Sequence, residues 1–116
     1  MLNFKFTYGG EYIGNYDVCF EVNRYVEGDR LAINLWFAED ECWEPFGDVT
    51  VNLPFARITD ENCGYLDINN MPCITDFLTE NNLGELTGKT AISGWVKYPE
   101  FRFNMEEIKK HCMEEN

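Results

Sequence analysis

Basic residues are scarce in this chain of 116 residues, in which nine Lys and Arg stand against 21 Asp and Glu, a formal net charge of −12. On so small a domain this negative field repels nucleic acids and anionic membranes and attracts basic partners. The composition therefore argues against direct binding to nucleic acid or membrane. Because the same charges repel one another, the fold needs a strong core, or a partner must benefit from the charge.

Long apolar runs are also missing. No stretch approaches the roughly 18 apolar residues that a membrane-spanning helix needs. Residues 1–8 alternate apolar and polar side chains, unlike the continuous apolar block of a signal peptide. We therefore expect a soluble, cytoplasmic protein.

Motifs for disulfides, metals and cofactors are absent too. The chain has five cysteines, none in C-x-x-C spacing, and a single histidine. We expect reduced thiols that pack as small hydrophobes, with no metal and no cofactor. The segment Asp60–Asp67 contains calcium-type ligands but lacks the spacing of an EF-hand loop. The cysteines are Cys19, Cys42, Cys63, Cys73 and Cys112.

The sequence shows no convergent set of catalytic residues. His111 and Cys112 are adjacent on a predicted helix, where neighbouring side chains point about 100° apart and cannot form a dyad with each other. The triplet Gly88-Lys89-Thr90 lacks the upstream glycine and following helix of a phosphate-binding loop. We therefore predict that the protein is not an enzyme and has no catalytic residues.

A substantial core is nevertheless encoded. Apolar residues make up 45% of the chain and aromatic residues 16%, far from the composition of a disordered protein. The length suits one domain, and neither repeats nor linkers divide it, so we predict a single domain spanning residues 1–116.

Period-two alternation predicts most of the secondary structure. Strands are expected at residues 4–8, 16–22, 31–37, 49–53, 65–68 and 89–98, with Gly94 as a bulge and Pro99 as a breaker. A mid-chain helix is predicted after Asn69-Asn70, with Pro72 in its first turn, and a C-terminal helix after Asn104. The predicted fold is α+β, a mainly antiparallel sheet of about five strands with both helices on one face.

One acidic cluster stands out as a candidate interaction site. The segment Glu39-Asp40-Glu41-Cys42-Trp43-Glu44 holds four carboxylates in six residues. On an extended chain Glu39 and Glu41 point the same way, so a regular row of negative charge beside Trp43 would resemble a nucleic-acid backbone to a basic groove. A solvated acidic loop is the alternative. The predicted partner-binding residues are Glu39, Asp40, Glu41, Trp43 and Glu44, with Asp60 and Glu61 as a weaker second pair.

Three segments resemble a known family: Trp43–Leu53, Asp67–Pro72 and Ser93–Phe103. In this order they are similar to a family of small uncharacterised proteins, a domain of unknown function carried largely by mobile elements and phages of gut Firmicutes. The resemblance implies no catalytic residues. It implies a context in which small acidic proteins often oppose host defences.

Three functions remain open from the sequence. The first is a non-enzymatic, anti-CRISPR-like inhibitor that occupies the basic nucleic-acid groove of a host defence protein, for example a Cas effector. The second is an accessory protein of a conjugative element that binds a protein through an exposed Trp36, Trp43 or Trp95. A small enzyme or ligand-binding domain is the third.

Overall fold

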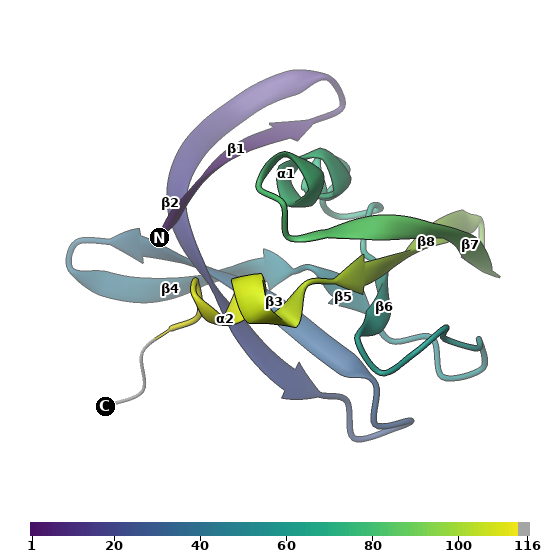
Figure 1. Ribbon diagram of the computed structural model, residues 1–116. Coiled ribbons are helices and arrows are strands. Elements are labelled where there is room, and N and C mark those ends of the chain that lie inside the picture. Colours follow the sequence, from purple (N-terminus) through teal and green to yellow (C-terminus); the bar gives the residue numbers. More distant parts are fainter. Residues whose placement is uncertain (114–116) are drawn as a thin grey trace.

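The computed structural model describes residues 1–113, which form two four-stranded antiparallel sheets and two short helices (Figure 1). The first sheet has the order β1-β2-β3-β4 and the second the order β5-β6-β8-β7. The strands are β1 (Leu2–Tyr8), β2 (Glu11–Arg24), β3 (Leu31–Glu39), β4 (Cys42–Asp48), β5 (Thr50–Val51), β6 (Cys63–Leu66), β7 (Gly84–Ser93) and β8 (Val96–Phe103). The helices are α1 (Ile74–Glu80) and α2 (Met105–Lys109).

The alternation of apolar and polar residues along its strands gives the first sheet one apolar face. In the register of the strands Phe4 lies opposite Tyr16, Phe20 opposite Leu35, and Val18 opposite Phe37. Directly opposite residues share a face of an antiparallel pair, so these side chains line the same side. Helix α1 packs on this face, with the ring of Phe77 4.6 Å from that of Phe4 between centroids.

The two sheets meet where β3 passes the end of β4. The N–H of Val49 donates to the carbonyl of Ile33 at 2.8 Å, and the N–H of Ile33 donates to Thr50 Oγ1 at 3.1 Å. This joint turns the chain from one sheet into the other while both remain on a shared core. Buried side chains from the two sheets and both helices form that core, including Ile33, Leu66, Ile74, Phe101 and Ile108.

The predicted fold class is corrected in its strand count. The domain is mostly β with eight strands in two sheets, rather than α+β with about five. Residues 84–103 form a hairpin instead of one strand, because Gly94 (φ +61°) and Trp95 make a two-residue turn between Ser93 and Val96. Pro99 lies within β8, at a position that β6 does not reach, so its missing N–H costs no bond there.

The predicted helices exist but are short. At α2 the side chain of Asn104 accepts from the N–H of Glu107, as the spacing predicts. The predicted start of the mid-chain helix is wrong, because residues 68–70 form a turn and α1 begins at Ile74 after Cys73, which makes no side-chain cap. None of the helices among residues 1–113 is long and apolar enough to cross a membrane.

Candidate functional site

The acidic cluster forms the tip of the β3–β4 hairpin. Glu39 pairs with Cys42, and Asp40 and Glu41 are the two central residues of the turn, with φ angles of +50° and +67°. A two-residue loop with both φ angles positive is a type I′ turn, whose twist matches the flanking strands. We call Glu39, Asp40, Glu41 and Glu44 the acidic hairpin tip; all four residues are exposed.

The turn changes how the carboxylates are arranged. The expected regular row of Glu39 and Glu41 on one strand is wrong, because Glu41 belongs to the turn. Glu39 lies opposite Cys42 and Glu44 opposite Phe37, so both glutamates emerge on the apolar-face side of the sheet. Trp43 lies opposite Ala38 and therefore on the other face.

No cation compensates the acidic hairpin tip within residues 1–113. The ion pairs of this part of the chain involve the carboxylates of Asp60, Glu85, Glu100 and Glu107. The four carboxylates of the tip share a small protruding loop, and their negative potential is therefore available to a partner.

The second predicted acidic pair lies elsewhere. Asp60 and Glu61 precede β6, and Figure 1 shows that the loop before β6 lies away from the tip of the β3–β4 hairpin. Asp60 accepts from the N–H of Asn62 and pairs with Arg102 at 3.0 Å, and these contacts lower the pKa of Asp60. The charge of Asp60 is thus engaged inside the domain, whereas Glu61 is exposed.

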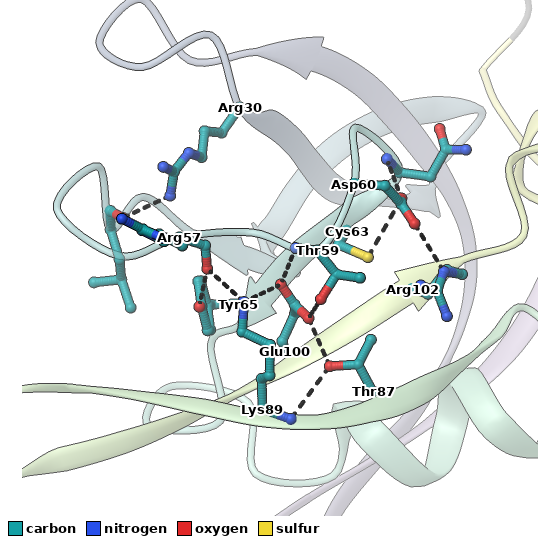
Figure 2. Close-up of polar contacts among 12 residues, drawn as sticks. Arg30, Arg57, Thr59, Asp60, Cys63, Tyr65, Thr87, Lys89, Glu100 and Arg102 are labelled. Carbon is teal, nitrogen blue, oxygen red and sulfur yellow. Dashed lines mark hydrogen bonds and ion pairs between the residues drawn. The ribbon is translucent and has the colours of Figure 1, made fainter.

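A buried glutamate, Glu100, is the polar centre that the sequence did not reveal (Figure 2). Its carboxylate accepts from the Thr59 N–H at 2.8 Å, from Thr59 Oγ1 at 2.5 Å and from Thr87 Oγ1 at 2.6 Å. Burial raises the pKa of Glu100, but these bonds and the Lys89 ammonium at 4.0 Å outweigh it and hold that pKa below its usual value. These contacts fasten the loop before β6 to β7 and β8.

A cleft of about 410 Å³ brings Trp43 together with Cys19, His111 and Cys112. The cleft has the residue types of a thiol active site, but its cysteines lack the lowered pKa that such a site needs. Burial, and to a smaller extent the neighbouring Cys112, raises the pKa of Cys19 to about 11, and burial also raises the pKa of Cys112. A nucleophilic cysteine needs the opposite shift. Within residues 1–113 no group of three or more His, Cys, Asp or Glu side chains is placed to hold a metal ion.

Comparison with known proteins gives one finding. Residues 19–116 match the profile of a family described as a domain of unknown function, DUF4313. The chain belongs to the DUF4313 family. Neither the curated proteins nor the solved structures contain a match.

The DUF4313 match covers the acidic hairpin tip, the second sheet and both helices, and begins within β2 at Cys19. It confirms the resemblance at the level of a domain of unknown function. The family description names neither a reaction nor a partner, so the absence of enzyme activity stays a prediction.

The turn itself supplies a first prediction. Only Gly, Asn and Asp adopt positive φ readily, and a residue such as Glu41 at +67° is held there at a cost of about 1 kcal/mol. Replacing Asp40 with Asn and Glu41 with Gly gives the preferred type I′ sequence. We expect the free energy of unfolding, measured by urea denaturation, to rise by about 1 kcal/mol, while binding to a basic partner weakens.

A matched control tests whether the gain comes from the turn. Lowering the charge elsewhere by the exposed pair Glu11→Gln and Glu27→Gln relieves repulsion without changing the β3–β4 hairpin. If this pair stabilises the protein as much as the turn variant does, the gain is electrostatic and the strain argument is wrong.

Proposed function

We propose that this protein is a non-enzymatic inhibitor that binds the basic nucleic-acid groove of a host defence protein, in the manner of an anti-CRISPR protein of a mobile element. The observation that carries the proposal is the acidic hairpin tip, which presents four exposed carboxylates that form no ion pair with any of residues 1–113. The net charge of −12 supports it, because the whole domain is drawn to a positive surface.

The hairpin suits this role physically. A two-stranded ribbon is slim, because its strands lie only about 5 Å apart, so it can enter a protein groove that is wide enough for nucleic acid. Its carboxylates meet the Lys and Arg side chains that ordinarily contact phosphates, and the field of the domain speeds the encounter. Binding of this kind competes directly with nucleic acid.

The test uses purified proteins. The protein is titrated onto a panel of Cas effectors and restriction enzymes, and affinity is measured at increasing salt with and without the cognate nucleic acid. We expect one effector to bind with an affinity that falls steeply as salt rises, and guide RNA or DNA to displace the protein. Tight binding that does not depend on salt would contradict nucleic-acid mimicry, and no binding to any defence protein would refute the proposal.

A second candidate function rests on Trp95. Its side chain is 104% exposed at the tip of the β7–β8 hairpin, next to Ile92 at 65%, whereas Trp43 is 37% exposed and Trp36 is half-buried. A fully exposed indole is a strong anchor for a protein partner because it buries much area on binding. Figure 1 places this hairpin and the acidic hairpin tip at opposite ends of the molecule, so the two functions are separable.

Trp95→Ser distinguishes the two candidates. Because the indole is fully exposed, we expect the substitution to leave the free energy of unfolding within about 0.5 kcal/mol of wild type. If the protein is an accessory protein, binding to its partner falls about tenfold or more, as for a hot-spot residue. If it is a nucleic-acid mimic, calorimetry shows unchanged affinity for the defence protein.

A further inference from the structure

An aromatic groove lies on the apolar face of the first sheet, beyond the part that α1 covers. The groove has a volume of about 490 Å³ and is lined by residues from β1, β2, β3 and β4 and from the turn after β6. Its floor is a set of half-buried rings around Phe46, whose centroid lies 4.9 Å from Tyr16, 5.3 Å from Phe6 and 5.8 Å from Phe37. We call this feature the aromatic groove.

Two β-bulges build this groove. The register shifts so that Ile13 is an extra residue of β2 opposite Phe6 and Thr7. It shifts again so that Phe46 is an extra residue of β4 opposite Leu35 and Trp36. A bulge redirects a side chain that regular pairing would place differently, and bulges are common beside binding sites. Both extra residues line the groove, and Ile13 is 53% exposed there.

The surroundings of the groove are acidic. Asp48 and Asp67 line it, and Glu44 emerges on the same face directly opposite Phe37. Asp67 is 7% exposed and accepts only from Asn70, at 2.9 Å and 3.4 Å, while Asp48 accepts from the amide of Asn34. None of the three carboxylates forms an ion pair within residues 1–113. The groove therefore places apolar side chains beside carboxylates that have no cationic partner in the described part of the chain.

We infer that the aromatic groove binds a segment of a partner protein in which a large apolar side chain is flanked by arginine. The apolar side chain fills the space among the rings, and the guanidinium group reaches the carboxylates. Arginine fits better than lysine, because its planar group stacks on aromatic rings and bonds a carboxylate through two N–H groups. The inference does not require a nucleic-acid-binding partner, so it stands or falls separately from the proposed function.

Ile13→Lys is the informative variant. The exposed position tolerates lysine, and the added cation fills the groove and repels arginine. Val26→Lys is its matched control, since Val26 is 105% exposed in the turn between β2 and β3 and does not line the groove. Both substitutions add the same charge to the domain.

The experiment selects ligands from a phage-displayed random-peptide library on the immobilised wild-type protein. We expect enriched peptides to carry a large apolar residue beside arginine. A synthetic copy should bind Ile13→Lys about tenfold or more weakly than wild type and Val26→Lys, and replacing its arginine with citrulline should cause a similar loss. Amide shifts in NMR spectra should map to Gly47, Asn70 and Met71.

Several results would overturn the inference. Peptides that bind Ile13→Lys and wild type equally do not use the groove, and peptides that tolerate citrulline do not use the carboxylates. Shifts confined to Asp40 and Glu41, in the turn of the β3–β4 hairpin, or to Trp95 place the site elsewhere. Enrichment of no peptide at all, or sedimentation showing that a second copy of the chain fills the groove, would also refute it.

Discussion

A protein with Glu39→Lys, Asp40→Asn, Glu41→Lys and Glu44→Lys is expected to associate with a basic partner about 10 to 1,000 times more slowly than wild type. The acidic hairpin tip is exposed and forms no ion pair within the described part of the chain, so its field steers the encounter, and steering changes on-rates by factors of this size. Asparagine is chosen at position 40 because it adopts the positive φ that the turn requires. Stopped-flow measurements at low salt report the rate directly.

The control variant must remove net charge without touching the hairpin. Four exposed acids serve this purpose because none of them forms an ion pair among residues 1–113: Glu11, Glu27, Asp76 and Glu80. Their replacement by lysine alters the charge of the domain by nearly the same amount. If this control slows association as strongly as the hairpin variant, the partner senses only the net charge and the hairpin is not the binding site.

The alternation of apolar residues predicted β1, β2 and β3 because one face of the first sheet is buried, but it did not predict β4, since the next strand was expected only at residues 49–53. Phe4, Phe20 and Ile33 all lie on that face as their spacing requires. The hairpins were harder to predict, because the residues of their turns are not specific to turns. Asp40-Glu41 is not a favoured turn sequence, and Gly94 within a strand pattern is equally typical of a bulge.

In the candidate site too, the features that are local along the chain could be predicted, and those that depend on distant residues could not. Sequence spacing located the acidic hairpin tip, because clustered charge is local along the chain. It did not predict that Asp60 pairs with Arg102, which is 42 residues away. The aromatic groove depends on two bulges, whose positions are set by how each strand pairs with its neighbour across the sheet and not by the residues of one strand alone.

Replacing Glu100 with alanine is expected to lower the free energy of unfolding by about 3–5 kcal/mol, a large part of the 5–15 kcal/mol typical of a domain. The carboxylate is fully buried, and its loss leaves the Thr59 N–H and the hydroxyls of Thr59 and Thr87 without their acceptor. A hydrogen bond to a charged group contributes about 1.5–3 kcal/mol. Urea denaturation measures the effect, and Glu85→Ala is the matched control, because Glu85 is exposed and pairs only loosely with Arg102, at 3.8 Å.

The pH dependence separates the charge of Glu100 from its packing. Because the pKa of Glu100 is lowered in the folded protein, its charge stabilises the fold fully above the unfolded value of about 4.3, and this contribution is lost as the pH falls through the folded pKa. Glu100→Gln keeps the shape and one acceptor but does not titrate. The stability difference between wild type and Glu100→Gln should therefore be largest near neutral pH and shrink as the pH drops toward 3. A difference that falls as the pH rises above about 4.3 would show that Glu100 is held as a neutral acid, and a difference that does not change with pH would show that its pKa is the same in the folded and unfolded chains. A loss below about 1 kcal/mol in Glu100→Ala would show that water replaces the carboxylate as the acceptor.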